Sequence, residues 1–331
     1  MMANDVVLIQ SLGVSRELVR ERFAAILPGH SLIWKGAELA AGRPLCELIG
    51  DARYLVTASL PIDGDTIRNC KLAMISVSFT GCDHVDLAAC RERGIAVYNA
   101  PGYSTDSVAE LSLGLALSLL RKIPQGDRVA RAESGNWYGF PAGAELRGKT
   151  VGIVGTGATG MAAAKLFAAF GCKLLGYNRT RKDEFVKLGG TYGGLDELLA
   201  NSDIVSLHLS LNAETRHILN AERIAKLRST SYVINTARGA LVDEAALAKA
   251  LKDGRLAGAG LDVFEIEPPM KDNPLVSAPN TVLTPHLGYK TKEALLRKVD
   301  VTFGNIADFE KGARKRAGTA GGRMKRKLTC F

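Results

Sequence analysis

The stretch TVGIVGTGATGMAAAKLFAAFGCKLLGYNRTR, residues 150–181, decides the fold of this chain. The apolar run Val151 to Val154 predicts a buried strand, and a glycine-rich turn with the spacing G-x-G-x-x-G follows it directly. The next residues have the apolar spacing of a helix from Met161 to Phe170, and a second strand is predicted from Lys173 to Tyr177. A strand, a glycine turn, a helix and a second strand in this order are typical of a dinucleotide-binding unit.

Each glycine of this turn has a physical purpose. Gly155 allows the tight turn, Gly157 lets the backbone approach a pyrophosphate, and Gly160 lets the helix pack closely on the strand. The free N–H groups at the start of the helix then hold the anion. We place Ala158 and Thr159, which lie between the second and third glycines, in the same cofactor site.

The residues after the second strand indicate which dinucleotide binds. In an NAD site this strand ends in Asp or Glu, which accepts hydrogen bonds from the ribose and repels a 2′-phosphate. Here the position is Asn178, and Arg179, Thr180 and Arg181 follow, so two guanidinium groups and a hydroxyl face a dianionic phosphate. The pattern predicts NADP(H) as the preferred cofactor and leaves NAD(H) open; the plainer explanation is a solvated basic loop.

Length and composition bound the class of protein. With 331 residues, 47% hydrophobic and 23% charged, we expect two globular domains. No apolar run is long enough to cross a bilayer, and the first residues do not have the pattern of a secretion signal, so we expect a cytoplasmic protein with no membrane contact. The six cysteines form no CxxC pair, and we predict no metal site.

The net charge of +9 is concentrated at one end of the chain. Residues 311–331 contain eight Lys and Arg and no acid, which leaves little excess charge for the rest. The glycines among these residues and the charge predict that residues 317–331 form a basic, disordered tail. Nothing in the tail resembles a nucleic-acid-binding fold, so nucleic acid is not the expected partner.

Strand and helix patterns alternate along the whole chain, which predicts an α/β protein with doubly wound parallel sheets. Residues 1–100 have such an alternation of their own, and a long apolar helix is expected from Ser104 to Leu120. A final helix is expected from about Lys292 to Lys311. The other expected strands are Val6 to Gln10, Tyr54 to Ala58, Met74 to Phe79, Ile204 to Leu209, Tyr232 to Asn235, Gly260 to Val263 and Val282 to Thr284, and the other expected helices include Ser15 to Ile26 and Glu244 to Leu251.

Three ionisable residues follow three of these strands: Arg238, Glu267 and His286. Ligands of an open parallel sheet bind at the carboxyl ends of its strands, so these residues are candidates for catalysis. An arginine can hold a substrate carboxylate and favour negative charge on a carbonyl oxygen. A histidine can give that oxygen a proton, and a carboxylate can orient the ring and favour its charged form. Alone, each residue also fits an ordinary structural role.

The chain resembles the D-isomer-specific 2-hydroxyacid dehydrogenase family over roughly residues 50–312. The motifs that carry the resemblance are VGIVGTGATG, NTARGALVDEAAL, GAGLDVFEIEPP and TPHLGY, with FTGCDHVDLAACRERGIAVYNAPGYSTDSVAEL upstream. The family's catalytic Arg, Glu and His match Arg238, Glu267 and His286. The resemblance further implies substrate contacts from Thr80 and Gly81 and cofactor contacts from His208, Thr236, Ala237, Asp262 and Gly288.

The same resemblance implies the arrangement of the domains. Two Rossmann-like domains are expected, with the nucleotide domain inserted in the substrate domain. The substrate domain would be formed by residues 1–100 plus 292–316, and the NAD(P)-binding domain by residues 101–291. A homodimer built around the long helix is also implied.

Three positions depart from the family pattern. Thr159 replaces a frequent Ile, Ser210 replaces a frequent Pro, and Asn178 replaces the usual Asp, which again favours NADP(H). The chain is similar to the short glyoxylate, hydroxypyruvate and 2-oxoacid reductases. We therefore expect NAD(P)H-dependent reduction of a small 2-oxo acid to the D-2-hydroxy acid. The alternatives are an NAD-linked D-lactate or D-3-phosphoglycerate dehydrogenase, and a nucleotide-sensing binding protein similar to the C-terminal-binding-protein corepressors.

Overall fold

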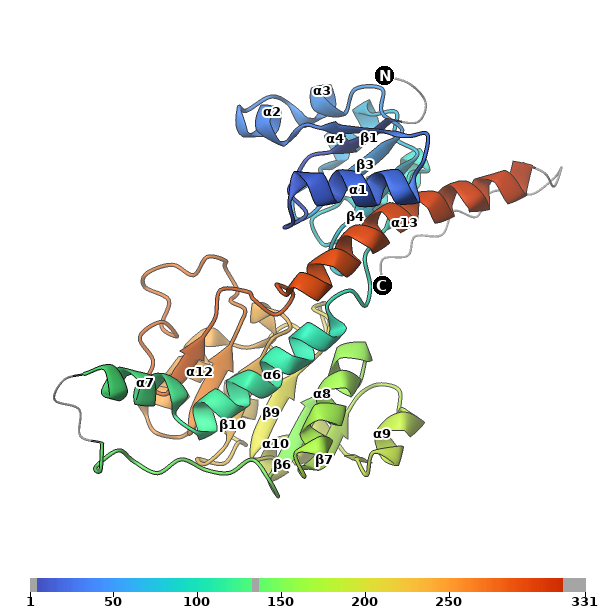
Figure 1. Cartoon of the computed structure of the whole chain (residues 1–331). Coiled ribbons are helices and arrows are strands. Elements are labelled where there is room, and N and C mark those ends of the chain that lie inside the picture. Colours follow the sequence, from blue (N-terminus) through green and yellow to red (C-terminus); the bar gives the residue numbers. More distant parts are fainter. Residues whose placement is uncertain (1–4, 133–136, 318–331) are drawn as a thin grey trace. The chain divides into compact units, whose positions relative to one another are not determined.

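The computed structural model describes residues 5–132 and 137–317 and divides the chain into two compact units (Figure 1). The first unit comprises the residues up to Ser104 together with those from Thr291 onward, and the second comprises Thr105–Lys290. The assignment of the first unit to the substrate and of the second to the cofactor stays a prediction.

The first unit is built on a parallel sheet whose described strands have the order β2-β1-β3-β4-β5. Its first helix begins where the side chain of Ser15 accepts a hydrogen bond from the backbone N–H of Leu18, with Glu17 in the first turn. The strands are β1 (Asp5–Leu8), β2 (Ser31–Trp34), β3 (Tyr54–Thr57), β4 (Met74–Val77) and β5 (Ala96–Tyr98). The helices are α1 (Arg16–Ile26), α2 (Gly36–Ala40), α3 (Leu45–Ile49), α4 (Gly64–Asn69), α5 (Leu87–Arg93) and α13 (Lys292–Ala317).

Alternate residues of these strands enter two different cores, as the period of two in a strand requires. Val6 and Leu8 of β1 pack with side chains of α1 and α13 on one face. Val7, between them, packs on the other face with Ile67 of α4 and Cys90 of α5. Helices therefore cover both faces of the sheet, and its strands are mostly apolar.

The second unit is built on a larger parallel sheet whose described strands have the order β12-β11-β10-β9-β6-β7-β8. The strand order reverses between β6 and β9, which pair directly, so this is the topological switch point of a Rossmann sheet. The strands are β6 (Thr150–Val154), β7 (Lys173–Tyr177), β8 (Thr191–Tyr192), β9 (Ile204–Leu207), β10 (Tyr232–Asn235), β11 (Gly258–Leu261) and β12 (Thr281–Leu283). The helices are α6 (Thr105–Leu120), α7 (Ile123–Arg131), α8 (Ala158–Ala169), α9 (Asp183–Lys187), α10 (Leu195–Asn201), α11 (Ala221–Ile224) and α12 (Glu244–Lys252), with a short 3-10 turn at Gly239–Leu241.

Two cores again lie on opposite faces of this sheet. Val151 and Ile153 of β6 pack with α6 and α8, which run side by side across one face (Figure 1). Val154 packs on the other face, with leucines of α10 and α12. Because both faces are covered, the ends of the strands are where the sheet is accessible to a ligand.

The structure confirms the predicted fold class, since both sheets are parallel and covered by helices on both faces. The sequence missed the short strands β2, β5 and β8 and several short helices. It also ended the last helix too early, because α13 continues to Ala317, the first residue of the predicted tail. The rest of that tail, residues 318–331, lies outside the described residues.

The turn after β6 shows why its glycines are needed. Gly155 has a φ of +98°, which L side chains rarely adopt, and the carbonyl oxygen of His208 lies 2.8 Å from where a Cβ would be. A Cβ on Gly160 would lie 1.9 Å from the carbonyl oxygen of Gly155, so helix α8 packs on the turn only with glycine here. A Cβ on Gly157 would meet nothing within 4 Å, so this position faces open space.

We expect Gly160→Ala to destabilise the protein strongly, because the added methyl group overlaps a backbone atom that cannot move away on its own. Overpacking of this kind costs about 1–3 kcal/mol or more. Thermal unfolding of the variant, compared with Gly157→Ala as the matched control, measures the effect. A Gly160→Ala protein that melts at the temperature of the Gly157→Ala protein would contradict the packing argument.

Candidate active site

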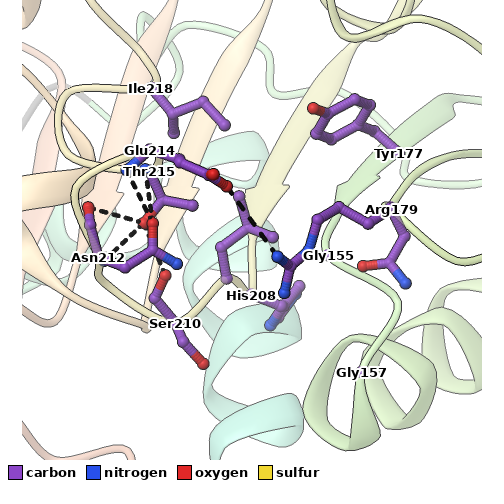
Figure 2. Close-up of a pocket in the computed structure, with 12 residues that line it drawn as sticks. Gly155, Gly157, Tyr177, Arg179, His208, Ser210, Asn212, Glu214, Thr215 and Ile218 are labelled. Carbon is purple, nitrogen blue, oxygen red and sulfur yellow. Dashed lines mark hydrogen bonds and ion pairs between the residues drawn. The ribbon is translucent and has the colours of Figure 1, made fainter. Parts of the chain in front are cut away.

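A pocket of about 220 Å³ lies at the switch point of the second unit's sheet, next to the carboxyl ends of β6, β7 and β9 (Figure 2). Its walls come from the glycine turn, from the residues after β7 and from the loop after β9. The lining residues are Gly155, Gly157, Tyr177, Asn178, Arg179, His208, Leu209, Ser210, Asn212, Glu214, Thr215 and Ile218.

Five predicted cofactor residues line this pocket, namely Gly155, Gly157, Asn178, Arg179 and His208. Ala158, Thr159 and Gly160 form the first turn of α8, whose N-cap is Gly157. Thr180 follows Arg179 but is not among the lining residues. Thr236, Ala237, Asp262 and Gly288 lie farther along the same sheet edge, after β10, β11 and β12. The structure thus brings part of the predicted set into one pocket.

The features of the turn and pocket fit a dinucleotide. The first N–H groups of α8 have no partner within the helix, and the position of Gly157 leaves open space beside them. His208 faces the same pocket, and its ring Nε2 lies 2.8 Å from the hydroxyl of Ser206. Its Nδ1 atom is buried and has no hydrogen-bond partner among residues 5–132 and 137–317.

Burial lowers the pKa of His208 to about 4, so this imidazole is neutral near pH 7. A neutral ring has one donor and one acceptor nitrogen. It therefore adds polarity to the pocket wall without adding a charge.

Asn178 has a structural role that the sequence analysis did not foresee. Its side-chain Nδ2 donates a 2.7 Å hydrogen bond to the carbonyl oxygen of Thr180. This bond closes a short turn after β7, and Arg179 lies in the middle of it. The side chain that was expected to face the ribose thus also shapes the loop that presents the arginine.

Arg238 lies at the carboxyl end of β10 in a turn fixed by Asn235. The side chain of Asn235 donates to the carbonyl oxygen of Arg238 at 2.8 Å and accepts from the N–H of Ala237 at 3.1 Å. The hydroxyl of Thr236 lies 2.7 Å from that of Ser112 on α6. Each residue from the strand end to the arginine is therefore held by a hydrogen bond, which limits the conformations of the turn.

Glu267 and His286 form a hydrogen-bonded pair. The Nδ1 of His286 donates to Oε2 of Glu267 at 2.7 Å, and the N–H of Phe264 donates to Oε1 at 3.0 Å. Burial by itself raises the pKa of Glu267, but these two hydrogen bonds and the charges of His286 and Arg238 outweigh it and lower that pKa below its ordinary value of 4.5. Glu267 is therefore ionised at neutral pH, and the other nitrogen of His286, Nε2, is left for a ligand.

The loop that carries His286 is organised by Asp262, which is 1% exposed. The carboxylate accepts hydrogen bonds from the Thr284 hydroxyl at 2.6 Å and from the N–H groups of Leu287 and Gly288 at 2.7 and 2.8 Å. His286 itself has a positive φ of 52°, and its N–H donates to the carbonyl oxygen of Asp262 at 2.9 Å. The resemblance implied a cofactor contact from Asp262, which stays a prediction, and in the structure its carboxylate holds the loop of the histidine.

Thr80 and Gly81, the predicted substrate residues, lie in the first unit in the loop after β4. The Thr80 hydroxyl donates to the carbonyl oxygen of Ala100 at 3.2 Å, and Asn99 donates to the carbonyl oxygen of Thr80 at 2.7 Å. Within the described ranges, the backbone N–H groups of Thr80 and Gly81 have no protein acceptor. These two donors are available to an anionic ligand.

Several polar residues that shape the sites were missed in the sequence. Gln10 accepts hydrogen bonds from the N–H groups of Ala58, Ser59 and Leu60, all between 2.9 and 3.0 Å, and so fixes the loop after β3. Glu214 lines the pocket at the switch point from the loop after β9. The position of that loop at the switch point is the signal that could have identified Glu214.

The described part of the chain contains no cluster of His, Cys, Asp and Glu suited to a metal ion. In the same residues, no helix is long and apolar enough to cross a membrane.

Comparison with known proteins gives consistent matches. Residues 113–288 match the family model described as D-isomer specific 2-hydroxyacid dehydrogenase, NAD binding domain. A glyoxylate reductase of Thermofilum pendens is 44% identical over 249 residues, which cover 73% of each chain. A hydroxypyruvate reductase of Blautia hydrogenotrophica is 34% identical and covers 86% of this chain and 90% of its own. The structure of the D-lactate dehydrogenase of Aquifex aeolicus with NAD and lactic acid has a TM-score of 0.79 at 30% identity, covering 97% of this chain and all of the other.

We expect Glu267→Gln to lower the free energy of unfolding by an amount that depends on pH. Because the folded-state pKa of Glu267 is lowered, its charge stabilises the protein above the ordinary carboxyl value of 4.5, and this contribution is lost as pH falls through the folded-state pKa. The difference between wild type and variant in urea unfolding should therefore shrink from pH 6 towards pH 3. A difference that is constant over this range would contradict the prediction.

Proposed function

We propose that this chain, which belongs to the D-isomer specific 2-hydroxyacid dehydrogenase family, reduces a small 2-oxo acid to the D-2-hydroxy acid with a nicotinamide cofactor. The observation that carries the proposal is the pair of Glu267 and His286, hydrogen-bonded at 2.7 Å, in the unit that also holds the nucleotide pocket. An imidazole oriented by a carboxylate is suited to exchange a proton with a carbonyl oxygen.

In this proposal His286 is the proton donor. Its Nδ1 is engaged by Glu267, so Nε2 faces the substrate and carries the proton that is transferred. The reduced nicotinamide, when bound, supplies a hydride to the carbonyl carbon. The oxygen of the former carbonyl takes the proton from Nε2, and the product is the alcohol; oxidation of the alcohol returns the proton to the same nitrogen. Glu267 stabilises the charged ring before the transfer.

Arg238 is assigned to the substrate carbonyl and carboxylate. Its guanidinium can donate hydrogen bonds to both groups and stabilise the negative charge that develops on the carbonyl oxygen. The free N–H groups of Thr80 and Gly81 support their assignment to the substrate carboxylate.

For the cofactor, we propose NADP(H) as the preferred form and NAD(H) as a usable one. The residues assigned to it begin with the glycine turn, where Gly157 and the start of α8 hold the pyrophosphate. Arg179 on the pocket wall is assigned to the 2′-phosphate, with no acid at Asn178 to repel it. The other assigned contacts are Ala158, Thr159, Thr180, His208, Thr236, Ala237, Asp262 and Gly288.

Glyoxylate and hydroxypyruvate are the proposed substrates. The glyoxylate and hydroxypyruvate reductases reported above support them, since they match most of this chain. D-lactate and D-3-phosphoglycerate are the alternative products. They correspond to substrates of different size, and we assign the selection by size to the loops around Ser59, Leu60 and Tyr289.

The experiment that tests the function is initial-rate oxidation of NADPH and NADH with glyoxylate, hydroxypyruvate, pyruvate and a bulky aromatic 2-oxo acid. We expect turnover with one of the small acids and a higher kcat/KM with NADPH than with NADH. A higher kcat/KM with NADH would contradict the assignment of Arg179 and leave the proton donor unaffected. No oxidation of either cofactor would contradict the enzyme and favour a nucleotide-sensing binding protein.

The variants that test the assigned catalytic roles in this assay are Arg238→Ala and His286→Ala. Each should lower kcat/KM by about two orders of magnitude or more, since proton transfer and charge stabilisation each contribute about a hundredfold or more. Near wild-type turnover in either variant would contradict the assigned roles, and binding of NADPH measured by fluorescence quenching shows whether the variant is still folded.

We also propose a homodimer and a cytoplasmic location. Ile123, Trp137 and Tyr138 expose 53%, 66% and 104% of their surface in the second unit, and large exposed apolar side chains of this kind support an interface. Light scattering should give twice the chain mass of 35.3 kDa for the wild type, with a weaker dimer in Trp137→Ser/Tyr138→Ser. The mass of a single chain for the wild type would contradict the dimer.

A further inference from the structure

The nucleotide pocket has two opposite charges facing each other across it. Arg179 follows β7 on one wall, and Glu214 belongs to the loop after β9 on the other. Their side chains reach toward one another, and Nη1 of Arg179 lies 4.0 Å from Oε2 of Glu214 (Figure 2). The residues that line the pocket include one arginine, Arg179, and one carboxylate, Glu214. His208, which also lines it, is neutral near pH 7.

The loop that carries Glu214 is fixed by local hydrogen bonds. The side-chain oxygen of Asn212 accepts from the N–H groups of Glu214 and Thr215 at 2.9 and 3.0 Å. In return, the hydroxyl of Thr215 accepts from the N–H of Asn212 at 2.8 Å and donates to the carbonyl oxygen of Ser210 at 2.8 Å. The backbone of Glu214 is thus held in place, so its side chain extends from a fixed point on the pocket wall.

The backbone turn that carries the arginine on the opposite wall is also closed by a hydrogen bond. The hydrogen bond from Asn178 to the carbonyl oxygen of Thr180 closes the turn that contains Arg179. The ion pair therefore joins two structured loops rather than two mobile chain ends.

We propose that Glu214 sets how strongly this protein prefers the 2′-phosphorylated cofactor, by competing with the 2′-phosphate for Arg179. The inference rests on the proposed nucleotide pocket and goes beyond it, because it assigns to Glu214 the control of specificity. A phosphate bound to Arg179 must share the guanidinium with a carboxylate that already lies 4.0 Å away. A ribose without the phosphate does not need Arg179.

The size of the effect follows from exposure. The side chains of Arg179 and Glu214 are 86% and 79% exposed, so their attraction is weakened by solvent and by salt. The carboxylate also repels the phosphate directly, since both are negative and bind the same group. Together these two effects correspond to a change in affinity of about three- to tenfold for the phosphorylated ligand alone.

The test is calorimetric binding of 2′,5′-ADP and of 5′-AMP, which differ only by the 2′-phosphate. The proteins are the wild type, Glu214→Gln, and Glu222→Gln as the matched control. Glu222 lies on α11 in the same unit and is also 79% exposed, so both variants lose one negative charge of equal accessibility. We expect Glu214→Gln to bind 2′,5′-ADP about three- to tenfold more tightly at low salt, with the Kd for 5′-AMP within about twofold of wild type.

The control should bind both nucleotides as the wild type does. An unchanged Kd of Glu214→Gln for 2′,5′-ADP would overturn the inference, and so would an equal gain for 5′-AMP or an equal gain in Glu222→Gln. In those cases the nucleotide pocket itself would stand. Failure of the wild type to bind either nucleotide would instead overturn the pocket, and with it the proposed function.

Discussion

The contact between the start of α8 and the turn before it is the constraint on which the second unit depends. Gly160 allows this contact because a side chain there would overlap the carbonyl oxygen of Gly155. Gly155, in turn, lies against the backbone of His208. Three segments, β6, α8 and the loop after β9, therefore meet closely at the switch point because Gly155 and Gly160 have no side chains, and the pocket lies beside the open position of Gly157.

Two acids, Asp262 and Glu267, support the histidine in different ways because their surroundings differ. Asp262 is buried and accepts three hydrogen bonds from the chain itself, so it shapes the loop of His286. Glu267 is 36% exposed, and one of its oxygens accepts from the His286 ring. A buried carboxylate that accepts several hydrogen bonds fixes the conformation of a loop, whereas a partly exposed carboxylate beside an imidazole can orient the ring for proton transfer. The candidate proton donor needs both.

The fold and the three candidate catalytic residues could be predicted because their signals are local. Apolar runs such as Val151 to Val154 form buried parallel strands, and Arg238, Glu267 and His286 follow the parallel strands β10, β11 and β12 within six residues. The edge strand β2 and the two-residue strand β8 were missed because each is only partly buried and has no continuous apolar run of useful length. The hydrogen bonds of Gln10 and Asn235 were missed because a polar residue at a strand end has many possible partners until the loops are folded.

The cofactor argument shows the same limit more sharply. Considered within its own segment, Arg179 after β7 favours a phosphorylated ribose. The residue before it is Asn178, where NAD sites have an acid. In the folded unit, a carboxylate from another loop lies within ion-pair distance of that arginine. On our proposal, the affinity for a 2′-phosphate then depends on the difference between two interactions of the same guanidinium, and a local motif contains only one of them. On our proposal, nucleotide preference is therefore a property of the two loops that meet at the switch point, not of the residue after the second strand alone.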